Sequence, residues 1–290
     1  MPTFFVIGAA KCGTTSLHEY LDLHPDISMS DVKEPRYFLE RTGRTGNKPS
    51  GRDAYLGLFK EGTAARGESS PQYSAFPHHD GVPRAIRLEV ENPRFIYLVR
   101  DPIERARSMV SNSKASPVKD GRLRRDMSLA EAFGDISRPL DSVILAGGLY
   151  MTQINHFLEE FSRHSILVVD SDELRLAPES VLSRIFGFLG LADLSVAPEE
   201  GIVMNRSDHL REKTRLYLAL ADLRFLRKLV YRLPRNRREA LIENVRRPLS
   251  RPLPTEPMEP ELRRQLEELY RPEVEKLREF TGMDFKSWSI

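Results

Sequence analysis

The feature that most constrains the fold lies in residues 3–23, where an apolar run is followed by small residues and then by a helical pattern. Residues 4–7 have the length and composition of a buried parallel strand. Gly8 and Gly13 bound a loop of small residues that contains Lys11. The first amides of a helix have no partner within it, and the helix dipole adds positive charge there. The arrangement therefore predicts an anion-binding site.

The spacing of this loop differs from that of a nucleoside-triphosphate P-loop, which reads G-x-x-x-x-G-K-[ST]. Gly8 and Gly13 keep the separation of the two glycines. However, Thr14 stands where the lysine belongs, and Lys11 lies inside the loop. The pattern favours a nucleotide whose phosphate is held by the loop while Lys11 reaches a bridging oxygen. The structural alternative is a strand–helix turn that is rich in glycine for packing alone.

Length and composition fit one large α/β domain or one domain with a helical extension. With 290 residues, 40% of them hydrophobic, the chain can bury a substantial core. The single cysteine, Cys12, excludes an internal disulfide and fits a reducing compartment. No apolar run approaches the roughly 20 residues of a membrane span, and no signal-peptide pattern is present. We therefore expect a soluble, cytoplasmic protein without a transmembrane segment.

Apolar runs and helical patterns alternate up to about residue 191. Strands are expected at 4–7, 27–29, 65–70, 94–100 and 166–169. Helices are expected at 15–23, 55–59, 83–90, from 102 onward, 129–133, 150–161 and 181–189. This alternation predicts a doubly wound parallel sheet flanked by helices. Residues 112–126 are polar and basic and are expected to be mobile.

Arg100 is expected at the carboxyl end of the strand over residues 94–100. Asp101 can cap the helix that follows, and Ser108 lies about two turns along it. Ligands of open α/β sheets bind at the carboxyl ends of the strands. Arg100 is therefore a candidate ligand of an anion, and its structural alternative is an ion pair with Asp101 or Glu104.

The chain changes character beyond residue 205, where a basic, proline-rich and helical part begins. Residues 206–251 contain fourteen Arg or Lys against five Asp or Glu. Residues 216–233 predict an amphipathic helix with a cationic side, and residues 259–280 predict an acidic amphipathic helix. We interpret residues 1–290 as a single domain, with an α/β core over about 1–195 and the helical part over about 205–290.

Two motifs together resemble those of PAPS-dependent sulfotransferases of the bacterial kind, which are similar to the heparan sulfate sulfotransferases. Residues 10–17, AKCGTTSL, resemble the loop that binds the 5′-phosphosulfate of 3′-phosphoadenylyl sulfate (PAPS). Residues 95–102, FIYLVRDP, together with Ser108, resemble the motif that binds its 3′-phosphate. The resemblance implies a P-loop-like three-layer fold, with a central parallel sheet flanked by helices and a helical C-terminal part. It also implies sulfonate transfer that leaves PAP as the product.

The resemblance also implies which residues bind PAPS, without a metal. The 5′-phosphate would be held by the loop residues Lys11, Cys12, Gly13, Thr14, Thr15 and Ser16. Arg100 and Ser108 would hold the 3′-phosphate, since an arginine offers a charged fork of donors. The family also closes a basic Lys-Gly-Arg loop over PAPS, and this chain lacks that tripeptide. Arg251, with Arg246 and Arg247, is the nearest candidate.

The catalytic residues implied by the resemblance are Lys11 and Glu34. Lys11 would stabilise the leaving phosphate at the bridging oxygen. Glu34, in the segment KEPRYF, matches the position of the general base that removes the proton of the acceptor. The structural alternative for Glu34 is a surface carboxylate paired with Lys33 or Arg36.

Several residues leave alternatives open. Glu68 is a rival for the general base, and so are His78 and His79. The family often has a lysine at or near Ser69, which this chain lacks. Cys12 lies near a helix N-terminus, where the pKa of a thiol is expected to fall, and a redox role is one hypothesis for it.

Three functional classes remain open: a sulfotransferase, a nucleotide kinase or NTPase with Asp170 as candidate Mg²⁺ ligand, and a non-catalytic binder of anionic surfaces. The last is motivated by the basic residues 206–251. For a sulfotransferase, the acceptor would be a carbohydrate, a lipid or another small-molecule natural product, and not a nucleic acid. O- and N-sulfation are both open, and so is the oligomeric state, with a homodimer among the alternatives.

Overall fold

A computed structural model describes residues 1–41, 51–115, 127–193, 211–213, 250–252 and 256–290. The chain divides into two compact units. The first comprises residues 1–107, 133–204 and 259–290, and the second comprises residues 108–132 and 205–258. Lys11, Glu34 and Arg100 all belong to the first unit, which we describe before the second.

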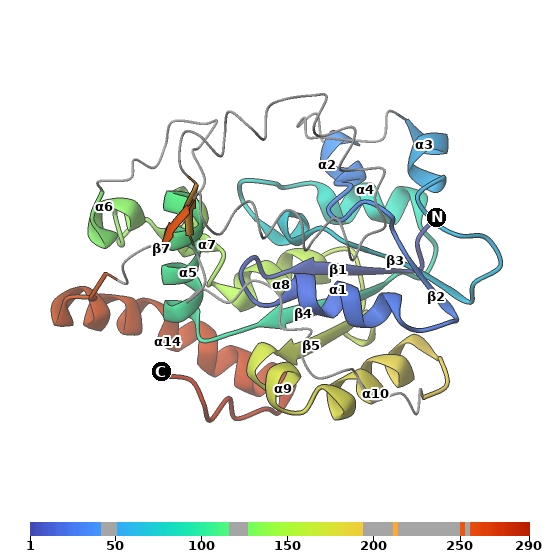
Figure 1. The fold of residues 1–290 in the computed structure, drawn as a ribbon. Coiled ribbons are helices and arrows are strands. Elements are labelled where there is room, and N and C mark those ends of the chain that lie inside the picture. Colours follow the sequence, from blue (N-terminus) through green and yellow to red (C-terminus); the bar gives the residue numbers. More distant parts are fainter. Residues whose placement is uncertain (42–50, 116–126, 194–210, 214–249, 253–255) are drawn as a thin grey trace. The chain divides into compact units, whose positions relative to one another are not determined.

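A five-stranded parallel sheet forms the centre of the first unit (Figure 1). Its strands are β1 (Phe4–Gly8), β2 (Ile27–Met29), β3 (Ala65–Ser69), β4 (Arg94–Val99) and β5 (Ile166–Asp170). Their order is β2-β3-β1-β4-β5, and every neighbouring pair is parallel. The chain thus builds β2 and β3 on one side of β1 and then β4 and β5 on the other. This arrangement confirms the predicted doubly wound sheet.

One face of the sheet is covered by α1 (Thr14–Asp22) and α10 (Pro178–Leu189). Leu17 and Leu21 are the buried leucines of α1, at the spacing of one helical face. The ring of His24, just after α1, meets the ring of Phe186 on α10 at 4.6 Å between centroids. Aromatic and aliphatic packing therefore joins the two helices of this layer.

The other face carries α2 (Tyr37–Arg41), α4 (Val82–Glu89) and α8 (Tyr150–Leu158). Phe5 of β1 packs edge-on against Phe38 of α2, with 5.7 Å between ring centroids. Phe95 of β4 meets Phe157 of α8 at 5.1 Å. The first unit also contains α3 (Arg52–Leu56), η1 (Pro71–Ser74), η2 (Pro139–Asp141), α7 (Val143–Ala146), η3 (Arg163–Ser165), α9 (Ser171–Leu176) and the start of α5 (Pro102–Ala115).

The predicted helix over residues 259–280 is confirmed as α14 (Pro260–Thr281). It belongs to the first unit and packs on α8, where Glu273 accepts hydrogen bonds from the amide and hydroxyl of Thr152 at 2.9 and 3.0 Å. Its buried side chains are Leu266, Tyr270, Val274 and Leu277. Part of the helical C-terminal segment is therefore packed against the α/β core.

The second unit contains the rest of α5, most of α6 (Leu129–Phe133) and an antiparallel pair, β6 (Arg211–Lys213) and β7 (Ser250–Pro252). Glu256 accepts hydrogen bonds from Lys114 Nζ at 2.8 Å and from the amide of Leu129 at 3.0 Å. Residues 112–115 form the end of α5, and the expected mobility of residues 112–126 stays a prediction. The predicted helix over 216–233 lies outside the described residues.

Gly67 of β3 lies opposite Phe4 and provides a test of the sheet packing. A Cβ at Gly67 would approach three ring atoms of Phe4 to between 2.0 and 2.5 Å. Because both faces of β1 are buried, we expect Gly67→Ala to lower the free energy of unfolding in urea by about 2–3 kcal/mol. Gly187→Ala is the control, since no atom lies within 4 Å of that Cβ on α10. Gly187→Ala should stabilise the helix by about 1 kcal/mol. Equal effects of Gly67→Ala and Gly187→Ala on the free energy of unfolding would contradict the packing of Gly67 against Phe4.

Candidate functional site

The loop between β1 and α1 is held by its own backbone and by β4. The amide of Ala9 donates to the carbonyl of Leu98 at 2.6 Å, and the amide of Cys12 donates to the carbonyl of Ala9 at 3.2 Å. Lys11 and Gly13 have positive φ angles of 74° and 88°. Gly13 is the N-cap of α1 and makes no side-chain cap. The first-turn amides of α1 therefore start at the carboxyl edge of the central strand, where they can bind an anion.

Gly8 at the end of β1 cannot carry a larger side chain. A Cβ there would lie 2.2 Å from the hydroxyl oxygen of Ser74 and 2.6 Å from the ring of Tyr97. The glycine is thus required by the close approach of η1 and β4 to the loop.

Lys11 lies among other charged groups at this edge of the sheet. Burial lowers the pKa of Lys11, and so do the positive charges of Arg100 and Lys33. Cys12 and Glu34 act in the opposite direction. Lys11 follows β1, Glu34 follows β2 and Arg100 follows β4. The structure therefore brings these three predicted residues into one electrostatic cluster at the carboxyl edge of the sheet.

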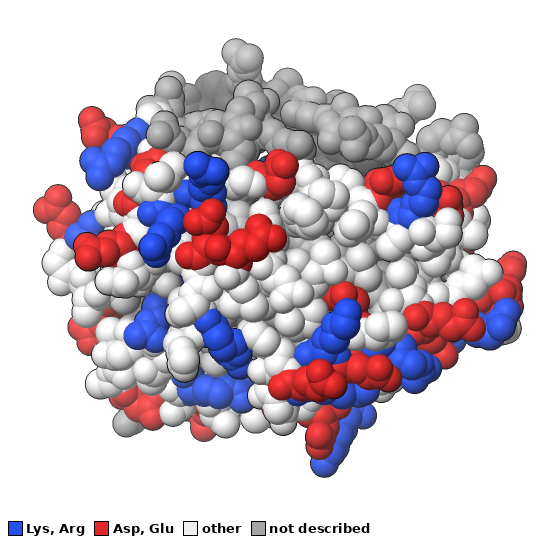
Figure 2. Space-filling view, turned by 180° about the vertical axis from the view of Figure 1, so that it is seen from behind, with Lys and Arg blue, Asp and Glu red and all other residues white. Residues whose placement is uncertain are grey.

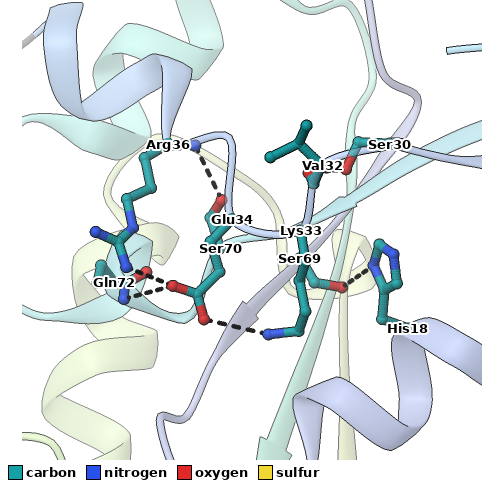
Figure 3. Close-up of polar contacts among 9 residues, drawn as sticks. All are labelled: His18, Ser30, Val32, Lys33, Glu34, Arg36, Ser69, Ser70 and Gln72. Carbon is teal, nitrogen blue, oxygen red and sulfur yellow. Dashed lines mark hydrogen bonds and ion pairs between the residues drawn. The ribbon is translucent and has the colours of Figure 1, made fainter. Parts of the chain in front are cut away.

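Glu34 is the centre of a network of polar side chains, which Figure 3 shows. Its Oε1 accepts from Lys33 Nζ at 3.2 Å, and its Oε2 accepts from Arg36 Nη2 at 2.5 Å and from Gln72 Nε2 at 3.0 Å. Burial raises the pKa of Glu34, but Lys33, Arg36 and Gln72 outweigh it, so the pKa lies below its ordinary value. The pairing expected for a surface carboxylate is thus present, in a side chain that is only 28% exposed.

The backbone around Glu34 explains how it reaches the site. The amide of Glu34 donates to the carbonyl of Ser69 at 3.1 Å, and the amide of Arg36 donates to the hydroxyl of Ser70 at 3.3 Å. Glu34 and Arg36 both have positive φ angles, 58° and 57°. The segment after β2 is therefore fastened to the carboxyl end of β3, which is the neighbour of β1. Non-glycine residues in this conformation occur where the surrounding structure imposes it.

Arg100 is positioned by its backbone. The hydroxyl of Tyr150 donates to the carbonyl of Arg100 at 2.6 Å. Asp101 confirms its predicted capping role, since its Oδ1 accepts from the amides of Ile103 and Glu104 at 2.9 and 3.1 Å.

Ion pairing does not account for Arg100 among the described residues. The second oxygen of Asp101 accepts from the amide and hydroxyl of Ser289 at 2.7 and 2.6 Å. Glu104 pairs with Arg107 at 3.0 Å. Both carboxylates that could have paired with Arg100 therefore have other partners.

The other predicted nucleotide ligands are placed as follows. Thr14 is buried and Thr15 and Ser16 are half-buried in the first turn of α1. Ser108 lies on α5 within the second unit and is buried. Arg251 lies on β7, opposite Glu212. Arg246 and Arg247 lie outside the described residues.

Burial argues against Glu68, the rival candidate for the general base. It is 0% exposed on β3, where its backbone lies opposite Phe5. Burial raises the pKa of Glu68 to about 7, although nearby Tyr73 and Tyr55 act to lower it. Neither carboxylate oxygen has a partner within normal hydrogen-bond geometry. An acceptor cannot contact this carboxyl group in the described structure.

The expectation of a lowered thiol pKa at Cys12 is also wrong. The side chain is 1% exposed, and its Sγ lies 3.8 Å from the hydroxyl of Tyr150. Burial raises the pKa of Cys12 to about 11. Loss of hydration thus outweighs the effect of the helix N-terminus, and the thiol is protonated at neutral pH.

Two of the histidines contact other parts of the fold, and two remain candidates for the general base. His18 Nδ1 lies 3.2 Å from the hydroxyl of Ser69, and His24 Nε2 lies 3.2 Å from the carbonyl of Ala192. Both rings are therefore held by contacts within the fold. His78 and His79 are half-buried between η1 and α4. A role for either as the base stays a prediction.

Two contributors to the site were missed by sequence reasoning. Gln72 has no signal in the sequence, because it meets Glu34 only through the pairing of β3 with its neighbours. Lys33 stands next to Glu34 in the sequence, but that position alone predicts only a surface ion pair.

None of Lys11, Glu34 and Arg100 lines the pocket at the end of β5. This pocket of about 470 Å³ lies between α9, α10 and residues 283–287, and Asp170 is among its lining residues. The described residues contain no group of three or more His, Cys, Asp or Glu that could hold a metal ion. None of their helices combines the length and apolarity needed to cross a membrane.

The chain is similar in sequence to known proteins. A sequence model of the sulfotransferase domain matches residues 1–212. The bifunctional heparan sulfate N-deacetylase/N-sulfotransferase 1 of Caenorhabditis briggsae is 27% identical over 201 residues, which are 67% of this chain and 23% of that protein. Protein 4 of the same kind from Mus musculus is 28% identical over 197 residues, 66% of this chain and 22% of that protein. The chain spans less than a quarter of the length of these relatives.

One solved structure is similar over the whole chain. The crystal structure of a sulfotransferase from Alicyclobacillus acidocaldarius aligns with 100% of this chain and 99% of that one, with a TM-score of 0.66 and 23% identity. This likeness confirms the predicted fold class.

Burial of Glu68 predicts a pH-dependent stability. Its pKa is 4.5 when unfolded and about 7 when folded, so the folded state keeps the proton up to a higher pH. Between these values stability falls as pH rises, because the unfolded state releases its proton first; above about pH 7 the loss is constant. We expect Glu68→Gln to remove this loss and to raise the free energy of unfolding by up to about 3 kcal/mol more at pH 8 than at pH 5.

Denaturant unfolding at both pH values measures the effect. Glu91→Gln is the control because Glu91 is exposed. If Glu68→Gln changes stability equally at pH 5 and pH 8, Glu68 is not titrating in the core.

Proposed function

Because the chain belongs to the sulfotransferase domain family, we propose that it transfers a sulfonate group from PAPS to a hydroxyl or an amine of an acceptor and releases PAP. The observation that carries this proposal is the cluster of Lys11, Glu34 and Arg100 at the carboxyl edge of the sheet. β1 lies where the order of the strands reverses, which is where ligands of such sheets bind.

The donor would be held at two anionic groups. The loop around Lys11 and the first turn of α1 offer amides and hydroxyls to the 5′-phosphosulfate. Arg100 and Ser108 would hold the 3′-phosphate, and Arg251 would contribute to closing over the nucleotide. Two separate phosphate sites account for PAPS as donor rather than a nucleotide without a 3′-phosphate.

The reaction would be an in-line displacement at sulfur. The bond between sulfur and the acceptor atom forms as the bond between sulfur and the bridging oxygen breaks. The electron pair of the broken bond stays on the phosphate of PAP, where Lys11 stabilises the charge. The proton of the acceptor passes to Glu34, whose lowered pKa keeps it ionised at neutral pH.

The acceptor class in this proposal is a carbohydrate, a lipid or another small natural product. The names of the relatives from C. briggsae and M. musculus refer to heparan sulfate and to N-sulfation. We therefore propose carbohydrates as the first class to screen, with both hydroxyl and amine acceptors. The proposal treats residues 1–290 as one domain that acts in the cytoplasm.

The other two functional classes gain no support from the described residues. Asp170, the candidate Mg²⁺ ligand of a kinase, caps α9 by accepting from the amide of Asp172 at 3.0 Å. Figure 2 shows acidic and basic side chains interspersed over the described residues of the face behind that of Figure 1. A surface built for anionic partners carries a field of one sign instead. Most of the basic residues 206–251 lie outside the described residues.

The two-phosphate proposal predicts that PAP raises the melting temperature more than AMP does. Each ligand at 100 times its dissociation constant adds about 2.7 kcal/mol, so at equal concentration the tighter ligand shifts the transition further. Arg100→Ala should reduce the shift with PAP to that with AMP, while Arg87→Ala, at an exposed position on α4, should not. Equal shifts with PAP and AMP in the unchanged protein would argue against a 3′-phosphate site.

The proposed base predicts a specific loss on changing Glu34. Glu34→Gln keeps size and hydrogen bonding but cannot take up the proton, so kcat should fall by about 10²–10⁴-fold. Binding of PAP, read by thermal shift, should stay near that of the unchanged protein. Turnover is measured with radiolabelled PAPS and an acceptor found by screening, with Glu61→Gln as an exposed control. Retained turnover in Glu34→Gln, together with its loss on changing His78 or His79, would reassign the base.

A further inference from the structure

We propose that Lys33 is a second cation on the transferring sulfonate, acting beside Glu34. This inference rests on the proposed function, because it concerns the group that PAPS donates. Lys33 thus becomes a catalytic residue rather than a surface partner of its neighbour.

The position of Lys33 supports this role. Its ammonium lies 3.2 Å from Oε1 of Glu34, and its side chain is 24% exposed. Figure 3 shows the Lys33 side chain with its nitrogen directed at Glu34. Its positive charge also acts on Lys11, whose pKa it lowers. Lys33 is therefore in contact with the proposed base, and its charge acts on the lysine proposed for the leaving group.

The balance of charge in this cluster favours an incoming anion. Lys11, Lys33, Arg36 and Arg100 each carry a positive charge, and Glu34 contributes one negative charge among these five residues. Like charges in partly buried positions repel one another because water screens them less. An anionic group that enters between Lys11 and Lys33 relieves this repulsion, whereas a neutral or cationic group does not.

The geometry of sulfonate transfer calls for a cation at this place. While sulfur moves from the bridging oxygen to the acceptor atom, its other three oxygens keep their negative charge. Lys11 is assigned to the bridging oxygen and Glu34 to the acceptor proton. Lys33 lies next to Glu34 and acts on Lys11, so it can donate to an oxygen that stays on sulfur. The ammonium of Lys33 has three N–H donors, so it can keep its hydrogen bond to Glu34 while it donates to the sulfonate of bound PAPS.

Comparison of PAPS with PAP separates this role from an ordinary ion pair, because PAP lacks the sulfonate. A charge-assisted hydrogen bond contributes enough that Lys33→Met should raise the dissociation constant of PAPS by about tenfold or more. The dissociation constant of PAP should not change. Lys33→Arg keeps the charge and should retain most of the affinity for PAPS. Both constants are measured by equilibrium binding without acceptor, with Lys276→Met, at an exposed position on α14, as control.

The outcomes are distinct. A selective loss of PAPS affinity in Lys33→Met, retained in Lys33→Arg, supports the inference. Unchanged affinity for both nucleotides overturns it and leaves Lys33 as a partner of Glu34 only. Equal losses for PAPS and PAP also overturn it, since Lys33 would then contact a phosphate or the fold. If the unchanged protein binds neither nucleotide, the proposed function fails, and this inference fails with it.

Discussion

The pairing of β1 with β3 on one side and β4 on the other is the constraint on which the candidate site depends. It places three strand ends next to one another, so residues distant in sequence reach one edge. Lys11 comes from the end of β1, and Arg100 from the end of β4. Glu34 comes from the segment after β2, which hydrogen-bonds to the end of β3. If these strands paired in another register, Lys11, Glu34 and Arg100 would no longer lie at the same edge of the sheet.

Electrostatics then determines what the cluster can do. Lys11 is partly buried beside Arg100 and Lys33, and this raises the cost of its charge in the absence of an anion. Glu34 remains ionised because three donors converge on it. Glu68 is one strand away and fully buried, and burial raises its pKa, so it keeps its proton up to a higher pH than Glu34 does. The two carboxyl groups thus differ in hydration and in partners, and of the two only Glu34 is exposed to solvent.

Local patterns were sufficient to predict the sheet and most helices, because buried strands and helical faces leave clear periodicity. Lys11 and Arg100 could be identified from their place after apolar runs. The surroundings of Glu34 could not, since its contact with Gln72 depends on strand pairing and on positive φ angles at Glu34 and Arg36. Cys12 shows the same limit: its position at a helix N-terminus is visible in the sequence, whereas the burial that raises its pKa is not.

The central claim is that the loop after β1 binds the 5′-phosphate end of the nucleotide with Glu34 facing the position of the sulfonate. A crystal structure of the protein with PAP tests it most directly. The account predicts the 5′-phosphate on the amides of residues 11–16, with Lys11 Nζ in contact with it and the carboxylate of Glu34 on the open side of that phosphate. PAP bound elsewhere, or a 5′-phosphate on the loop with Glu34 turned away from it, would contradict the account.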